Sequence, residues 1–422
     1  MSMTKNLPGP EDITRVELPN GIVVLSRPNF HSPSVVINGY LAAGSLSDPK
    51  ELGGLSDFTS GALMHGNAVQ TFQETYDLLE SVGASCGFSG GTHTTSFGGR
   101  SLVEDLDLML NVIRNSLLEP TFPIEHFERR RTQILTHLSI RAQDTSEMAS
   151  QCFDEILYAD HPYGLPEDGT VESVRAIQRQ DLQEFHRKHY GPKGCVISIV
   201  GGVDPLVAVE KVQMYLGDWK NPIQPQQPEL PPIKMLNETT RKKVTLPAKS
   251  QSDLLIGVIG PNRAAPDYLT AAVGNNILGQ FGMYGRIGNS VREKSGLAYY
   301  AFSHMSGGIG PGIWYAGAGV DPANVELAIE LILAELKKFT HEQVTDEELE
   351  DTKANFIGRL PLGFESNSGV AGSLIHLERY QLGLDYYQRY QNLIQQTTAE
   401  DILSAAQKYL DLERIAIVVA GS

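Results

Sequence analysis

The chain contains one segment twice. Residues 181–201 read DLQEFHRKHYGPKGCVISIVG, and residues 401–421, which lie 220 positions later, read DILSAAQKYLDLERIAIVVAG. Each copy has the pattern of an amphipathic helix, then a short break, then an apolar and β-branched run that closes on glycine. This pattern predicts a helix followed by a buried strand. Its recurrence indicates two domains with the same fold.

A second pair of segments agrees with this repeat. Residues 123–138 (PIEHFERRRTQILTHL) and 344–360 (VTDEELEDTKANFIGRL) both read as helices with an acidic first turn. The intervening residues 221–238 contain five prolines, which favour an extended linker. We therefore expect an α+β protein of two homologous α/β-sandwich domains related by a pseudo-two-fold, each an antiparallel sheet with helices, at 1–220 and 239–422.

Hydrophobic periodicity also predicts individual elements within each half. In the first half, strands are expected at 22–26, 35–42 and as a pair within 84–99, and helices at 53–64, 71–81, 105–117 and 123–141. In the second half, strands are expected at 253–260, 298–305 and 313–320, and helices at 268–278 and 287–292.

The composition excludes several classes of protein. The 422 residues carry a net charge of −16 without a basic stripe, so nucleic acid is not expected as a partner. No window has the roughly 20 apolar residues of a membrane span. The polar N-terminal stretch 1–14 has no secretory signal, so we expect a cytoplasmic protein, or a periplasmic one if a signal has been removed. Cys86, Cys152 and Cys195 are expected to be buried, small apolar residues.

Residues 54–67 read GLSDFTSGALMHGN. This stretch resembles the N-terminal domain of the inverzincin zinc metallopeptidases of the pitrilysin and mitochondrial-processing-peptidase type, which reads like GLAHFLEHMLFKGT and carries H-x-x-E-H. The apolar frame is kept, but the chemistry differs. By this resemblance, Asp57 replaces the first metal histidine, Ser60 replaces the general-base glutamate, and Gly61 replaces the second histidine.

The family's remaining zinc ligand is a glutamate in a motif of the type F-E-x-x-R-x-x-I-L-E-E-I. Residues 127–138 read FERRRTQILTHL, which places His137 at the ligand position. A catalytic zinc ion takes about three protein ligands and an open site for water. Asp57 and His137 supply at most two ligands and no general base. We expect this chain to bind no zinc; a vestigial metal site at these two residues is the alternative.

The second half of the sequence, in contrast, keeps a motif of this family. Residues 291–301 read VREKSGLAYYA and resemble the family's VREKRGLAYSV, with Arg292 and Tyr299 at its seven-residue spacing. The resemblance implies that both side chains face the zinc ion across the cleft. A guanidinium and a phenol O–H there would stabilise the negative charge that peptide hydrolysis creates. Taken without the motif, Arg292 reads as a surface charge and Tyr299 as a half-buried strand aromatic.

Together, these motifs resemble the Arg/Tyr subunit of a two-subunit enzyme of this family. The resemblance implies a protein that is inactive alone and pairs with a homologous, zinc-bearing subunit to cleave unfolded peptides. A catalytically inert scaffold, similar to the core subunits of the respiratory bc1 complex, is one alternative, and a self-pairing, peptide-binding dimer is another. Residues 83–91 (GASCGFSGG) lack the Asn-Ala step that metal-bearing members have near Gly87, which weakens the case for a peptide that adds as a strand to this half.

Overall fold

The computed structural model describes residues 7–280 and 284–422, and its contacts divide the chain into two units. Residues 1–6, which begin the polar N-terminal stretch, and 281–283 lie outside the described residues. Unit 1 comprises the described residues of Met1–Leu138 together with Pro166–Glu229 and Pro361–Gln388. Unit 2 comprises the described residues of Ser139–Leu165, Leu230–Leu360 and Arg389–Ser422. The border at Glu229 falls inside the proline-rich segment 221–238, in which no residue is assigned to a helix or strand.

Unit 1 contains a six-stranded sheet in the order β1-β2-β6-β3-β5-β4. Its β2 and β6 are parallel and all other neighbours are antiparallel. The strands are β1 Thr14–Glu17, β2 Val23–Pro28, β3 Ser34–Leu41, β4 Ser85–Ser89, β5 Thr95–Leu102 and β6 Val196–Gly201.

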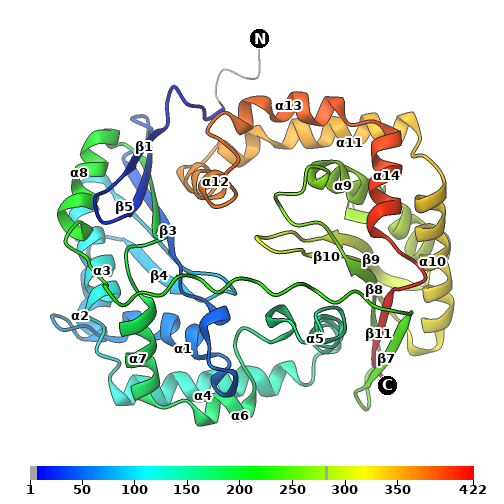
Figure 1. Cartoon of the computed structure of the whole chain (residues 1–422), viewed down its shortest axis with the longest axis horizontal. Helices are drawn as coiled ribbons and strands as arrows, with labels where there is room; N and C mark the ends of the chain where they lie inside the picture. Colours follow the sequence, from blue (N-terminus) through cyan, green and yellow to red (C-terminus); the bar gives the residue numbers. More distant parts are fainter. Residues whose placement is uncertain (1–6, 281–283) are drawn as a thin grey trace. The chain divides into compact units, whose positions relative to one another are not determined.

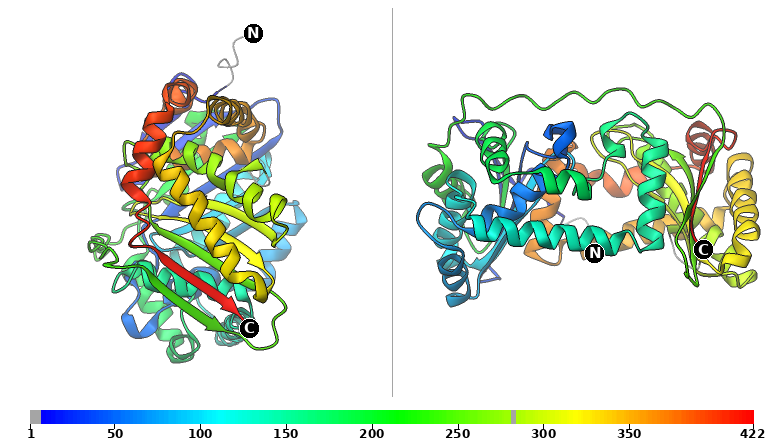
Figure 2. Two further views of the ribbon diagram at one scale, coloured as in Figure 1. Left: turned by 90° about the vertical axis from the view of Figure 1, so that its right-hand side faces the viewer. Right: turned by 90° about the horizontal axis from the view of Figure 1, so that it is seen from below.

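Unit 2 contains a five-stranded sheet in the order β7-β11-β8-β10-β9. Its strands are β7 Thr240–Thr245, β8 Ser252–Ile259, β9 Ala298–Met305, β10 Ile313–Val320 and β11 Ala416–Gly421. The parallel pair is β7 and β11, drawn side by side in green and red in the left view of Figure 2. The order and pairing match those of β2-β6-β3-β5-β4 in unit 1, which confirms two sheet-plus-helix domains of one fold. Both sheets are mixed rather than wholly antiparallel, because one strand in each returns through a long connection to run parallel with its neighbour.

The repeated segment has the predicted structure. Helix α7 (Arg179–His189) precedes β6, and α14 (Ala399–Tyr409) precedes β11. The bounds of the second copy follow those of the first by 220 residues (179 + 220 = 399; 201 + 220 = 421). The weaker pair also matches, as α4 (Ile124–Arg141) and α11 (Asp346–Arg359).

Helices cover both faces of the unit 1 sheet (Figure 1). Alternation along the strands sends Ile37, Ile197 and Ile199 into one core. On the opposite face, the Ser198 hydroxyl donates to the backbone carbonyl of Ala371 in α12, at 3.0 Å. The helices of the first face include α1 (Leu55–Ala62), α3 (Leu106–Leu118) and α8 (Pro205–Leu216), and the opposite face is covered by α12 (Asn367–Arg379).

Unit 2 has the same layers. Leu254 and Ile256 face a core shared with α9 (Tyr268–Asn275), α10 (Val325–His341) and α14. Leu255 and Val418 face a second core with Phe153 of α5 (Thr145–Leu157). The remaining helices of the described chain are α2 (Phe72–Ser81), α6 (Val171–Ala176) and α13 (Tyr386–Gln396), with short 3-10 and π turns between them. None of the described helices is long and apolar enough to cross a membrane.

The covering helices α5 and α12 are exchanged between the two halves of the sequence. The division expected at 1–220 and 239–422 places α5 with the first half and α12 with the second. By contact, α5 belongs to unit 2 and α12 to unit 1. Each follows a long helix, α4 or α11, in the chain. Figure 1 shows α5 beside β8 and β11, and α12 beside β3.

Candidate functional site

Helix α1 carries the degenerate metal motif and is fixed at its N-terminus by Asp48. The carboxylate of Asp48 accepts hydrogen bonds from the backbone N–H of Gly54 at 3.0 Å and of Ser56 at 2.9 Å. Both donors belong to the first turn, where N–H groups have no helical partner. Burial raises the pKa of Asp48 to about 7, although these hydrogen bonds oppose the shift. Gly54 has a left-handed φ of 92°, and a Cβ there would lie 2.7 Å from the carbonyl oxygen of Asp168.

Aromatic stacking holds α1 against α4. The rings of Phe58 and Phe127 are both buried and lie 4.9 Å apart with an interplanar angle of 11°. This contact brings residues 57–61 of α1 next to the start of α4. The first three predicted site residues, Asp57, Ser60 and Gly61, therefore share one helix that faces α4.

Arg130 of α4 is the cation at this place. Its Nη2 lies 3.4 Å from the Asp57 Oδ2, and both side chains are mostly buried. Burial raises the pKa of Asp57 above its ordinary value, and the Arg130 guanidinium opposes this rise by favouring the ionised carboxylate. In the family that this motif resembles, a metal ion carries the positive charge at this place. In this chain, the Arg130 guanidinium carries it.

Ser60 and Gly61 offer no ligand to a metal. The buried Ser60 hydroxyl donates to the backbone carbonyl of Asp57, three residues before it, at 2.9 Å. A Cβ on Gly61 would lie 2.7 Å from Nη2 and 2.9 Å from Cζ of Arg130. Any side chain at position 61 would therefore require the guanidinium to move.

His137 lies seven residues, or about two turns, after Arg130 on α4. Its side chain is 68% exposed, and its Nε2 lies 3.9 Å from the Oδ2 of Asp168. Within residues 7–280 and 284–422, no group of three or more His, Cys, Asp and Glu side chains is arranged to hold a metal ion. Three features of this place do not fit zinc. The Arg130 guanidinium lies against Asp57, Gly61 has no side chain that could act as a ligand, and the Ser60 hydroxyl is bonded within its own helix.

Arg130 was not singled out in the sequence, and two signals could have identified it. Arg130 and His137 differ by seven positions, so they lie on one face of α4. Gly61 is a poor helix residue, which indicates a close neighbour. Neither signal shows that Arg130 lies against Gly61, because this contact depends on the packing of α1 against α4.

Arg292 and Tyr299 lie at the junction of a short helix and an edge strand of unit 2. The π-helical turn Gly288–Lys294 ends at Gly296, whose φ is 64° and whose N–H donates to the Arg292 carbonyl at 2.9 Å. This bond, with the left-handed glycine, is the αL type of helix stop, and the N–H of Leu297 adds a longer bond to the Val291 carbonyl at 3.1 Å. Strand β9 begins two residues after Gly296, as its pattern predicts.

The two neighbouring tyrosines of β9 point to opposite faces of the sheet. The Tyr300 hydroxyl donates to the carboxylate of buried Asp253, which also accepts from Thr145. Tyr299 is 82% exposed, and its side chain has no hydrogen bond or ring contact with any described residue. Arg292 is partly exposed, and its Nε lies 3.9 Å from the Oε1 of Glu293.

Arg286 anchors the turn that carries Arg292. Its Nε and Nη2 donate to the two carboxylate oxygens of Glu348, each at 2.7 Å. Its guanidinium also lies over the ring of Phe339, 5.7 Å from the centroid. Glu348 belongs to the capping box of α11, so this pair ties the turn to the end of a long helix.

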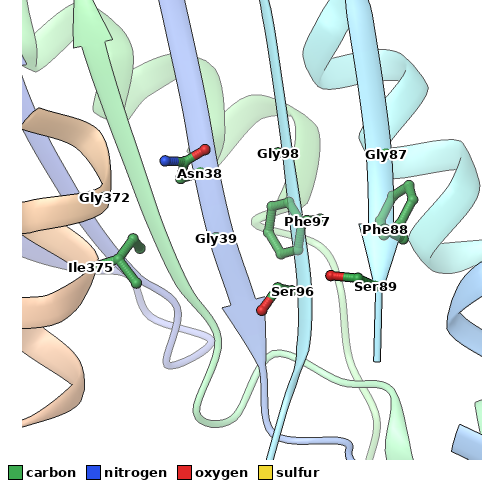
Figure 3. Close-up of a pocket in the computed structure, with 10 residues that line it drawn as sticks. All are labelled: Asn38, Gly39, Gly87, Phe88, Ser89, Ser96, Phe97, Gly98, Gly372 and Ile375. Carbon is green, nitrogen blue, oxygen red and sulfur yellow. The ribbon is translucent and has the colours of Figure 1, made fainter. Parts of the chain in front are cut away.

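A hollow of about 430 Å³ lies on the α12 side of the unit 1 sheet and reaches the edge strand β4 (Figure 3). Its floor crosses β3, β5 and β4 where side chains are missing or small. A Cβ on Gly87 would meet no atom within 4 Å, so the space above this strand is open. The lining residues are Asn38, Gly39, Gly87, Phe88, Ser89, Ser96, Phe97, Gly98, Gly372 and Ile375.

The fold and the site define a protein with two similar sheet-plus-helix domains, the first of which resembles a metallopeptidase metal motif at Asp57, Ser60 and Gly61. Comparison with known proteins agrees with this class. Residues 23–169 match the family described as Insulinase (Peptidase family M16), and residues 176–356 match the Peptidase M16 inactive domain. The chain belongs to peptidase family M16.

Relatives and solved structures cover nearly the whole chain. An uncharacterized zinc protease of Mycobacterium leprae is 25% identical over 97% of this chain and 92% of its own length. The mitochondrial-processing peptidase subunit beta of Saccharomyces cerevisiae is 24% identical over 84% of this chain and 79% of its own. The crystal structure of a peptidase M16 inactive domain from Pseudomonas fluorescens is 25% identical, with a TM-score of 0.91 over 97% of this chain and 98% of that one.

Proposed function

We propose that this chain is the non-metal subunit of a two-subunit zinc peptidase. In this proposal, Arg292 and Tyr299 assist a zinc site that a homologous partner provides. The chain contributes peptide binding and transition-state stabilisation, while the partner contributes the zinc ion and the general base. The substrate is an unfolded peptide.

The observation that carries the proposal is that the Tyr299 side chain is exposed and makes no hydrogen bond or ring contact with a described residue. A tyrosine on an edge strand ordinarily packs its ring or bonds its hydroxyl, as Tyr300 does with Asp253. Tyr299 does neither within the described chain, although Gly296 and the turn before it hold its backbone firmly. A phenol that is exposed on a rigid element, with an arginine seven residues before it, is ready to donate to a group from outside the chain.

The chemistry of peptide hydrolysis explains why these two groups suit the role. Attack on the scissile carbonyl places negative charge on its oxygen, and donors fixed in advance stabilise that charge without reorganisation. A guanidinium supplies charge and directed N–H groups, and a phenol supplies one O–H. Relatives named zinc proteases, and one named as a processing-peptidase subunit, support an assembly of this kind.

The test combines the purified chain with a family relative that carries H-x-x-E-H and measures cleavage of an unfolded peptide. Loss of one transition-state donor costs roughly 10²–10³ in kcat. We expect Tyr299→Phe and Arg292→Ala each to reduce kcat by about this factor while both subunits still co-elute. Lys294→Ala removes a charge from the same exposed turn and should leave kcat within about twofold.

Tyr300→Phe provides a matched contrast to Tyr299→Phe. It removes the same atom one residue later, but from a hydroxyl that bonds to buried Asp253. We expect a lower melting temperature for Tyr300→Phe and an unchanged one for Tyr299→Phe. Full activity of the assembly with both Arg292→Ala and Tyr299→Phe would contradict the proposal and favour the inert scaffold.

A further inference from the structure

We infer that Arg130 acts as an internal cation that excludes divalent metal from the degenerate motif, in addition to the loss of the zinc ligands. This inference concerns unit 1 alone and does not depend on the proposed role of Arg292 and Tyr299. It links Gly61 to Arg130, because the guanidinium occupies the space that a side chain at position 61 would need.

The first argument is steric. The guanidinium atoms Nη2, Cζ and Nε of Arg130 would lie 2.7, 2.9 and 3.0 Å from a Cβ on Gly61. Contacts this short do not persist, so a histidine at position 61 and this placement of Arg130 exclude each other. The backbone of α1 is also closely packed at Gly90, where a Cβ would lie 2.8 Å from the Cα of Asp57.

The second argument is electrostatic. Asp57 is the one carboxylate of the degenerate motif, and its negative charge is already paired with Arg130 at 3.4 Å. A divalent ion at this place would have to separate Asp57 from Arg130, and the guanidinium would repel it. The Nε of Arg130 is buried without a hydrogen-bond partner among the described residues, and the pair is longer than an ideal charge-assisted bond. Packing beside Gly61, rather than optimal bonding to Asp57, therefore sets its position.

The main test restores the family's residues by Asp57→His, Ser60→Glu, Gly61→His and His137→Glu. The restored chain is prepared with Arg130 and with Arg130→Ala, and zinc is measured by metal analysis after equilibration with zinc chloride. We expect at least 100-fold tighter zinc binding, and a larger zinc-induced rise in melting temperature, for the Arg130→Ala version. Arg129→Ala in the restored chain removes an exposed charge one residue away and should leave binding weak.

Equal zinc affinity with Arg130 and with Arg130→Ala would overturn the inference. Zinc binding by neither version, with both folded by circular dichroism, would also overturn it, because something other than Arg130 would then exclude the metal. Because the measurement uses the single chain, it is independent of whether a peptidase partner exists.

A smaller set of variants tests the steric step should the restored chain fail to fold. Gly61→Ala ordinarily favours a helix. We expect it to lower the melting temperature when Arg130 is present, since the guanidinium must leave Asp57, and to raise it in the Arg130→Ala background. A rise of the same size in both backgrounds would contradict the assigned contact between Gly61 and Arg130.

Discussion

His65 shows how burial beside α4, with a smaller effect of nearby charges, changes the pKa of a single residue. Its ring is stacked on that of His126 at a centroid distance of 5.3 Å and lies against the edge of Phe72 at 5.7 Å. Burial lowers the pKa of His65 to about 4, with smaller contributions from His126, Arg130 and Arg129. Between about pH 6.5 and pH 4, the unfolded chain therefore takes up a proton that the folded chain does not. The stability of unit 1 should fall as the pH is lowered through this window.

We expect His65→Phe to reduce this loss of stability. Phenylalanine keeps the stacked ring and removes the group that protonates on unfolding. Between pH 7 and pH 4, the decline in unfolding free energy should be smaller by about 1 kcal/mol, a value reduced from the full shift because the ring is partly exposed. Thermal unfolding as a function of pH measures it, with the exposed His31→Phe as control. An identical decline in His65→Phe and the parent chain would contradict the account.

The sequence identifies the positions at which the family's metal-binding residues are missing, but it does not identify Arg130 as the cation beside them. Asp57, Ser60, Gly61 and His137 were identified by their places in two motifs, and their assigned roles remain predictions. Arg130 stands in a run of three arginines on an amphipathic helix, where charged side chains ordinarily face solvent. Its position depends on a glycine in another helix, so the seven-residue spacing from His137 and the glycine at position 61 do not reveal the contact without the packing of α1 against α4.

Among the secondary-structure elements, the strands that were not predicted are two with polar sequences. The bounds of β9 and β10 agree with the predicted 298–305 and 313–320. Strands β1 (TRVE) and β7 (TRKKVT) were not predicted, because both are short, polar edge strands. Periodicity also shows that a helix such as α5 has an apolar face, but not which sheet that face will cover.

The assignment of α5 to unit 2 can be tested with Phe153→Ala. Phe153 is fully buried and its ring lies 5.7 Å from that of Tyr315 in β10. Truncation of a buried phenylalanine costs about 3–5 kcal/mol. We expect faster amide hydrogen exchange in β8, β10 and β11, with β2, β3 and β6 unchanged. Glu155→Ala, on the exposed side of the same helix, should change neither set, and faster exchange in β3 instead would contradict the assignment.

The anchor between Arg286 and Glu348 gives a prediction about the turn that carries Arg292. Lysine cannot reproduce the two parallel hydrogen bonds of the guanidinium. We expect Arg286→Lys to destabilise unit 2 by about 1 kcal/mol and to lower kcat of the mixed enzyme about tenfold at unchanged KM. The control is Arg241→Lys, because Arg241 makes a similar but exposed pair with Glu326. Equal effects of the two substitutions would show that the pair has no positioning role.

For the whole molecule, the two domains share strand order and pairing but differ at their candidate site residues. Unit 1 has an arginine beside a glycine where the family carries metal ligands, and unit 2 keeps an exposed tyrosine on an edge strand. Under the proposed function, this chain supplies half of a hydrolytic site. The proposed function therefore requires a second chain that supplies the other half.

The most direct test of this claim is a peptide-cleavage assay of the purified chain, of its zinc-bearing relative, and of the two mixed, each with and without a chelator. We predict cleavage by the mixture that the chelator abolishes and that Tyr299→Phe reduces about 10²–10³-fold, with none by this chain alone. Chelator-sensitive cleavage by the pure chain would contradict the account and would return Asp57 and His137 to consideration as metal ligands.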